Sequence, residues 1–158
     1  MPLEYAARIP VSDEYLVSLG RATYIFAYYE SMIVDLIDRF TPGFKTEVAR
    51  SKRNHTAGSI RGKLKEVIDD ASTDFSRISK AELQGVHDRF DAIIDRRNSL
   101  IHGRPITAPD DSQILAYQGH MGKTTPDEQW PAHAIDDFSN EVAKERIEHV
   151  GPLFERVR

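Results

Sequence analysis

The sequence contains no cysteine. This absence excludes a disulfide framework, a thiolate metal site, a cysteine nucleophile and an iron–sulfur cluster. Because a chain without thiols has no need of an oxidising compartment, we predict a cytoplasmic protein. The chemistry that remains open to the chain belongs to histidine, arginine and carboxylate side chains.

Long hydrophobic runs are absent as well. The longest nearly uncharged stretch, Ala22 to Val34, contains Glu30 and is shorter than the roughly 20 apolar residues of a membrane span. The N-terminal Met-Pro-Leu-Glu-Tyr lacks the basic start and apolar run of a signal peptide. With 40% hydrophobic and 29% charged residues, the composition predicts a single soluble domain over residues 1–158 with no membrane partner.

An overall positive charge is also missing, because the formal net charge is −4. The whole protein therefore repels polyanions, and a nucleic-acid site needs a local basic patch. Between Lys45 and Lys65, seven basic residues stand against Glu47 alone. We predict that this segment contacts an RNA backbone through Lys45, Arg50, Lys52, Arg53, Arg61 and Lys63. The alternative is a solvated loop face, which is the commoner origin of a basic run.

Helical periodicity dominates the chain. Apolar residues recur at three- and four-residue steps over residues 12–40, 56–70 and 79–103. Ser79 and Glu82 have the spacing of a capping box, and Pro131 suits the start of a last helix. Residues 44–55 are predicted to form a polar loop. The middle of the first helix is apolar on more than one face, which predicts a second surface that meets a partner chain.

Proline and glycine interrupt residues 104–130, where Gln113 to Tyr117 has the composition of a strand. We predict a short irregular or β-hairpin insertion there. The expected fold is all-α, a four-helix up-and-down bundle with this insertion between its last two helices.

The most informative residues end the third helix, in the stretch Asp95-Arg96-Arg97-Asn98-Ser99-Leu100-Ile101-His102-Gly103. The apolar steps of that helix lead to Arg97, so a guanidinium occupies a position where the pattern calls for an aliphatic residue. Asn98 and His102 are four residues apart and share a face with Asp95. Arginine binds phosphate bidentately and histidine titrates near neutrality, which are the properties that phosphodiester chemistry requires.

The same residues also have a purely structural interpretation. Arg97 would pair with a buried carboxylate, for which Glu30 is the obvious partner. His102 would then interact favourably with the helix C-terminus through the helix dipole. Residue types alone leave both interpretations open.

The run Arg97-Asn98-Ser99-Leu100-Ile101-His102 resembles the motif of HEPN domains, an arginine, a polar residue, three spacers and a histidine. These domains are helical-bundle ribonucleases of prokaryotic toxin and defence systems. The resemblance implies that Arg97 and His102 form the catalytic site and that Asn98 helps to hold the arginine. Arg96 would satisfy a longer spacing to His102, but the choice of Arg97 places Asn98 at the polar position.

The resemblance further implies a metal-independent endoribonuclease without a cofactor. The ribose 2′-hydroxyl would attack the adjacent phosphate and leave a 2′,3′-cyclic phosphate, at a homodimer cleft where two motifs face each other. A toxin or defence role with an antitoxin partner protein follows from the same likeness. The alternatives are a non-catalytic HEPN module that binds nucleic acid or a nucleotide, and a dimeric interaction domain in which Arg97 pairs with Glu30.

No metal site is predicted. The six histidines do not have metal-ligand spacing. Asp88, Asp91 and Asp95 share a helix face, and we interpret them as a solvated acidic stripe rather than a hard-metal site.

Overall fold

The fold is built on one long helix. The computed structural model describes residues 10–51, 55–119 and 127–157. Helix α1 (Asp13–Phe40) begins after Ser12, whose hydroxyl accepts a hydrogen bond from the Tyr15 amide. Its buried side chains, among them Phe26 and Ile33, recur at the helical spacing that the sequence predicts.

A short helix, α2 (Phe44–Arg50), follows where the sequence predicted a polar loop, and that prediction is wrong. Gly43 has a φ of 100°, a backbone conformation that favours glycine. The Asp38 carboxylate accepts hydrogen bonds from the Gly43 and Lys45 amides at 3.0 and 2.9 Å. Phe44 is buried. One aromatic side chain and a cap from the preceding helix thus stabilise α2, and neither produces a periodic pattern.

The next two helices follow the sequence closely and pack on each other. Helix α3 (Ala57–Asp69) begins after Thr56, whose hydroxyl accepts from the Ser59 amide. Helix α4 (Lys80–Ile101) begins with the predicted capping box, in which Ser79 and Glu82 satisfy each other's backbone amides. The two helices contact each other along their apolar faces. Helix α4 ends at His102, so the predicted motif lies in its last turns.

Three strands connect α4 to the last long helix. They are β1 (Arg104–Thr107), β2 (Gln113–Tyr117) and β3 (Glu128–Trp130), and they form an antiparallel sheet in the order β1-β2-β3. Gly103 comes so close to β2 that a Cβ atom there would lie 3.1 Å from the Leu115 Cβ. The glycine therefore favours this close approach, because a larger side chain would need the neighbouring strand to shift by a few tenths of an ångström.

The sheet is joined to the helices by buried side chains. Trp130 is fully buried, and its indole Nε1 donates to the Ser99 hydroxyl of α4 at 3.0 Å. The Tyr15 hydroxyl of α1 donates to the Trp130 carbonyl at 2.8 Å and accepts from the Leu115 amide at 2.9 Å. Leu115 and Trp130 are partners in the ladder between β2 and β3. One tyrosine hydroxyl therefore connects two strands and the first helix.

The predicted fold class is wrong. An all-α, four-helix up-and-down bundle with a hairpin insertion does not describe the molecule, because residues 104–130 contribute a three-stranded sheet whose Ile114 and Trp130 belong to the core. The structure also contains α2, a helix that the sequence did not predict. The chain remains largely helical, and no helix of the described segments is both long and apolar enough to cross a bilayer.

The last helical segment of the chain contains a π-helical turn. Helix α5 (Ala132–Glu145) leads into a π-helical turn, η2 (Arg146–Val150), and then into α6 (Gly151–Arg156). The Gly151 amide donates to the Arg146 carbonyl, five residues back. Pro152 lacks an amide hydrogen and its ring conflicts with a carbonyl in a regular α-helix, which accounts for the wider turn before it.

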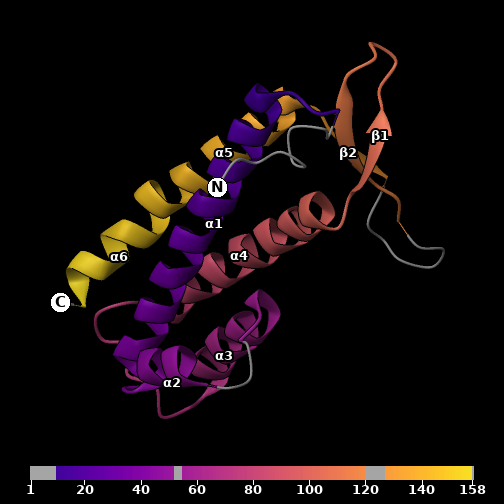
Figure 1. Ribbon diagram of the computed structural model, residues 1–158. Coiled ribbons are helices and arrows are strands. Elements are labelled where there is room, and N and C mark those ends of the chain that lie inside the picture. The colour runs from indigo at the N-terminus through magenta and orange to yellow at the C-terminus, as the bar shows by residue number, and fades with distance from the viewer. Residues whose placement is uncertain (1–9, 52–54, 120–126, 158) are drawn as a thin grey trace.

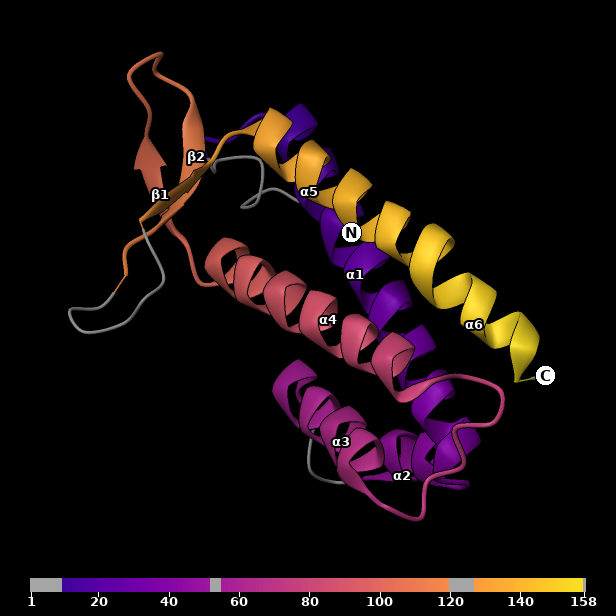
Figure 2. The same cartoon turned by 180° about the vertical axis from the view of Figure 1, so that it is seen from behind.

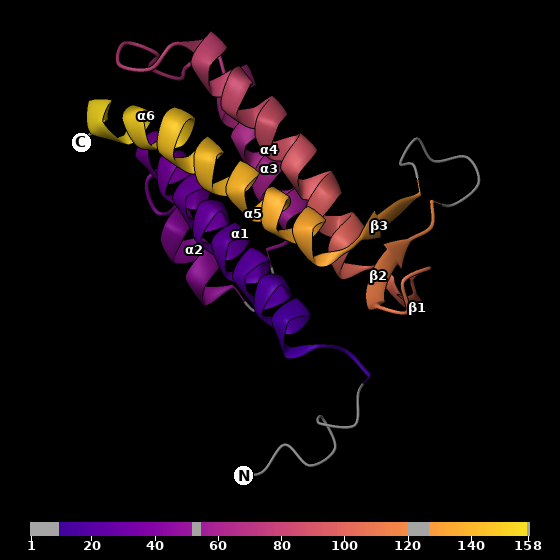
Figure 3. The same cartoon turned by 90° about the horizontal axis from the view of Figure 1, so that it is seen from above.

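The helices surround a common core, and the sheet lies at one end. Helices α1 and α5 lie side by side, with α6 extending the line of α5 (Figures 1 and 2). Helix α4 ends at the sheet, which Figure 3 shows extending beyond the helices on that side. The Arg89 Nε donates to the buried carboxylate of Glu145 at 2.7 Å, which joins α4 to α5. The end of α4 is thus held between α1, α5 and the sheet.

Candidate functional site

Arg97 lies in the last turns of α4 and faces α1. Its guanidinium carbon lies 5.0 Å from the centre of the Phe26 ring, a cation–π contact. Its Nη1 donates to the Asn98 Oδ1 at 3.1 Å. The sequence predicted that Asn98 holds the arginine, and the structure brings these two side chains into contact. Phe26 was not predicted as a partner, although its helical spacing placed it on the inner face of the first helix.

A small cavity opens beside this arginine. Its volume is about 110 Å³, and α1, α4 and α5 all contribute to its wall. Two charged side chains line it, Glu30 from α1 and Arg97 from α4. The remaining walls are mostly apolar and include Phe26, Leu100 and Phe138. The cavity therefore combines one carboxylate and one guanidinium in surroundings of low polarity, where charges interact strongly.

Glu30 faces Arg97 without a direct contact. Within the described part of the chain, no hydrogen bond or ion pair reaches the Glu30 carboxylate, so the predicted Arg97–Glu30 pair is not formed at contact distance. Burial raises the pKa of Glu30, and the positive charge of Arg97 offsets part of that rise. In the described residues every other resolved carboxyl shift lowers the pKa, as at Asp69, Asp88 and Asp110.

His102 is exposed at the C-terminal cap of α4. Its backbone amide donates to the Asn98 carbonyl at 3.0 Å, and its side chain is not among those that line the cavity. Positions five residues apart on an α-helix differ by about 140° around the axis. Arg97 and His102 therefore point in different directions, and one chain does not gather the two motif side chains over one cavity.

The neighbouring motif residues have other surroundings. Arg96 forms ion pairs with Glu141 and with Glu128, and its guanidinium lies 5.3 Å from the centres of the Trp130 and Phe138 rings. Asp95 is exposed. Since Arg96 is engaged by two carboxylates, Arg97 is the arginine of this pair that remains available to a ligand.

Ser99, inside the motif, has a role that the sequence did not predict. It is buried, its hydroxyl donates to the Glu128 Oε2 at 2.7 Å, and it accepts from the Trp130 indole. The motif helix is thereby fixed to the sheet directly behind the Arg97 cavity. The sequence around this serine gave no signal for these contacts, because both partners lie about 30 residues further along the chain.

The basic segment is largely neutralised by neighbouring carboxylates. Lys45 contacts Asp35 at 2.7 Å, Lys63 contacts Glu66 at 2.9 Å, and Lys65 contacts Asp69 at 2.8 Å. Arg61 contacts Asp91. Arg50 is exposed at the end of α2, while the predicted contacts Lys52 and Arg53 lie outside the described residues. The described part of this segment is therefore a mixed-charge surface.

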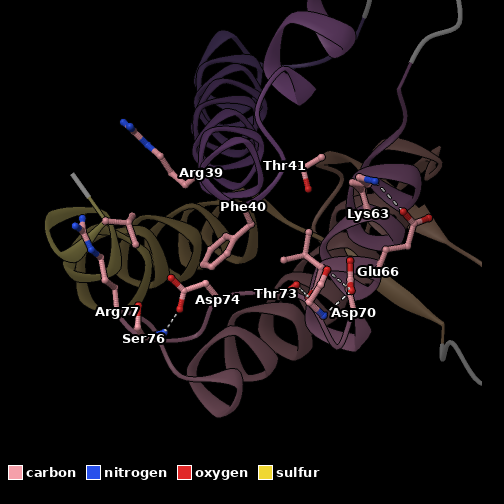
Figure 4. A pocket seen from close by; sticks show the side chains of 13 residues that line it. Arg39, Phe40, Thr41, Lys63, Glu66, Asp70, Thr73, Asp74, Ser76 and Arg77 are labelled. Carbon is pink, nitrogen blue, oxygen red and sulfur yellow. Dashed lines mark hydrogen bonds and ion pairs between the residues drawn. The ribbon is translucent and has the colours of Figure 1, made fainter.

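A larger cavity, of about 570 Å³, lies among the C-terminal end of α1, helix α3 and residues 72–77 (Figure 4). Four of its charged side chains have local partners: Lys63 and Glu66 pair with each other, Asp70 accepts from Ser72, and Asp74 accepts from the Ser76 amide. Figure 4 shows Arg39 directed away from Phe40 and Asp74. Because its polar groups do not converge on one point, we place the candidate site at Arg97 instead.

Comparison of the chain with protein-family models, with curated proteins and with solved structures finds no match. Within the described residues, no group of three or more histidine, aspartate or glutamate side chains is arranged to hold a metal ion.

Proposed function

We propose that this protein is a HEPN-type, metal-independent endoribonuclease that acts as a homodimer. The observation that carries the proposal is the Arg97 site, a half-buried guanidinium held by Phe26 and Asn98 at the mouth of a small cavity. A preoriented arginine of this kind is suited to bind a phosphate and to stabilise the negative charge that develops on it.

In the proposed reaction, Arg97 binds the scissile phosphate and Asn98 keeps the guanidinium in place. The ribose 2′-hydroxyl gives its proton to a base as its oxygen forms the bond to phosphorus, the bond from phosphorus to the 5′-oxygen breaks, and the product carries a 2′,3′-cyclic phosphate. His102 supplies a proton to the leaving 5′-oxygen. No metal or cofactor takes part in this scheme.

The exposed apolar face of α1 supports the homodimer. Tyr24 is 73% exposed and Val17 is 57% exposed, and Leu16, Tyr28 and, from α4, Ile101 extend this apolar surface. Such a surface on a small domain is characteristic of a protein–protein interface. Because His102 points away from its own Arg97, we propose that the partner's histidine completes the site at the dimer cleft. A toxin or defence role, with an antitoxin partner, belongs to the same proposal.

The test is cleavage of RNA in excess EDTA by the wild type, Arg97→Ala and His102→Ala. We expect both variants to lose about 10²- to 10⁴-fold in rate, and mass spectrometry to detect cyclic phosphate ends on the wild-type products. Arg39→Ala and His133→Ala, which remove exposed residues outside the cavity, are the matched controls. Cleavage that persists in both motif variants contradicts the proposal.

Mixing the two inactive variants tests the shared site. If Arg97 and His102 of different chains act together, a mixed dimer contains one intact site, and an equal mixture regains about a quarter of wild-type activity. If each chain uses its own pair, every site in the mixed dimer has one defect and the mixture stays inactive.

One observation favours a second candidate function. The exposed His102 lies outside the Arg97 cavity, as expected for a HEPN module that binds nucleic acid or a nucleotide without cutting it. RNA binding that depends on Arg97 and weakens with salt, without cleavage, would select this function.

A further inference from the structure

Glu30 is a half-buried carboxylate that the scheme above leaves without a role. It lines the Arg97 cavity from α1, yet within the described residues it forms neither a hydrogen bond nor an ion pair. Neither of its carboxylate oxygens is among the fully buried side-chain atoms without a partner, so both stay open to water or to a ligand. A carboxylate left in this state can accept a hydrogen bond or a proton from a bound molecule. Glu30 is therefore an acceptor whose partner the chain itself does not supply.

The opposite charge nearby is held away from it. Arg97 packs on the Phe26 ring and donates to Asn98, and these contacts fix its guanidinium without bringing it to Glu30. A cavity of about 110 Å³ adjoins both groups. Since a water molecule takes up about 30 Å³ of liquid, the cavity has room for a few water-sized groups but not for a nucleobase. A hydroxyl and a phosphate oxygen fit this space and match the two charges.

The environment of Glu30 also makes it a stronger base than an ordinary carboxylate. Burial raises its pKa, whereas the other resolved shifts of described carboxyl groups are downward. Arg97 of α4 is the charged group that faces it in the cavity; α1 adds Thr23 and α5 adds Phe138, which do not titrate. A base works best when its pKa approaches the working pH.

We propose that Glu30 is the catalytic base that accepts the proton of the ribose 2′-hydroxyl, an inference that rests on the ribonuclease function proposed above. The proton passes from the 2′-oxygen to the Glu30 carboxylate as the bond from that oxygen to phosphorus forms. The bond between phosphorus and the 5′-oxygen breaks, and the leaving oxygen takes its proton from the protonated His102 of the partner subunit. Arg97 binds the phosphate throughout, and in-line displacement requires the base and the acid to act on opposite sides of the phosphorus.

The first experiment compares pH–rate profiles of the wild type, Glu30→Gln and the control Glu14→Gln, an exposed glutamate near the start of the same helix. In the acidic part of the pH–rate profile, we expect the kcat/KM of the wild type to rise with pH because Glu30 loses its proton. Glu30→Gln should lose about 10²- to 10⁴-fold in kcat, and its profile should lack this rise, the acid limb. Its affinity for an RNA with a 2′-deoxy residue at the cleavage position should be retained, and Glu14→Gln should behave like the wild type.

The second experiment is chemical rescue of Glu30→Ala. Formate is small enough for the space that the truncated side chain leaves, and we expect it to restore cleavage in proportion to its concentration. Arg97→Ala should not respond to formate, because it retains the base and lacks the phosphate ligand. Circular dichroism of each variant establishes that it is folded before its rate is compared.

The outcomes separate the base from the overall function. If the wild type cleaves RNA in an Arg97-dependent manner but Glu30→Gln keeps its rate and acid limb, the assignment of Glu30 is overturned and the ribonuclease proposal stands. If Glu30→Gln loses RNA affinity and keeps the wild-type pH profile in its residual rate, Glu30 is a structural neighbour of Arg97 and the assignment is also overturned. If the wild type does not cleave RNA, both proposals fail.

Discussion

At the scale of single residues, the ionisation of Glu30, the proposed base, also affects stability. Its folded-state pKa lies above the ordinary value of 4.5 because burial disfavours the charged form. The folded protein thus keeps a proton at pH values where the unfolded chain has released it. By linkage, this group lowers the free energy of unfolding as the pH rises from about 4.5 through its raised pKa.

We therefore predict that Glu30→Gln is more stable than the wild type at neutral pH and that this advantage shrinks on acidification toward pH 4.5. The glutamine keeps the shape of the side chain and removes its ionisation. Urea unfolding of both proteins at a series of pH values measures the difference, with Glu14→Gln as the control that should follow the wild type. Parallel curves for Glu30→Gln and the wild type would show that burial of Glu30 has no energetic consequence.

The sequence predicted the seam position of Arg97 on its helix but not the contacts that its side chain makes. The periodic pattern of the third helix placed Arg97 at an apolar seam position, and the structure finds it half-buried against α1. It does not pair with Glu30, because Phe26 and Asn98 hold it elsewhere. A linear motif gives the spacing of Arg97 and His102 along the chain, whereas their directions depend on the helix, which separates them by about 140°.

At the scale of elements, the attachment of the sheet to α1 relies on one hydroxyl group. The Tyr15 hydroxyl connects the Leu115 amide to the Trp130 carbonyl, and burial raises the pKa of that hydroxyl. Removing it leaves two backbone groups of the β2–β3 ladder without their partner. The cost of an unsatisfied buried group is about 1–3 kcal/mol.

We predict that Tyr15→Phe lowers the free energy of unfolding by about 1–3 kcal/mol and speeds hydrogen exchange at the Leu115 amide. Ser59→Ala is the control, since it removes an exposed hydroxyl of α3, outside the proposed dimer surface, and should change stability by less than about 0.5 kcal/mol. Denaturant unfolding and amide exchange measured on the same samples check both effects. Unchanged exchange at Leu115 would mean that the tyrosine does not hold the strand.

The sequence predicts an element well when the residues that stabilise it lie within that element. Helices α1, α3 and α4 have their apolar periodicity and their capping residues within their own sequence, and they form close to the predicted bounds. Strand β3 has only three residues and is fixed by Tyr15 and Ser99, which lie far from it in the chain. The cap of α2 from Asp38 and the widened turn before Pro152 have local causes, but those causes do not repeat with a helical period, so apolar periodicity does not reveal them.

At the scale of the whole molecule, charge arrangement matters more than charge count. The net charge is −4, and the basic segment that was predicted to bind RNA has carboxylates beside four of its described cations. Those carboxylates already act as counterions. Fewer bound salt ions are therefore released when a phosphate backbone binds there.

We predict that the double variant Asp35→Asn/Glu66→Gln, which frees Lys45 and Lys63, binds single-stranded RNA more tightly than the wild type. Its plot of log affinity against log salt concentration should be steeper by about 1.4, which corresponds to two further phosphate contacts. The control, Glu14→Gln/Asp137→Asn, removes the same charge from exposed positions outside the segment. Equal slopes for the two double variants would exclude the segment from the RNA interface.

The pairing of α1 with α5 also has a consequence during synthesis of the chain. Part of the buried face of α1 packs on a helix that begins at Ala132, and the Tyr15 hydroxyl donates to the Trp130 carbonyl. At ordinary translation rates the interval between synthesis of the two helices is on the order of ten seconds. Helices α2, α3 and α4 can cover other parts of α1 earlier, but during that time the strip that packs on α5 has no intramolecular partner. Nascent chains on one polysome would carry this strip uncovered next to one another, so a chaperone or a neighbouring copy is the first surface it can meet.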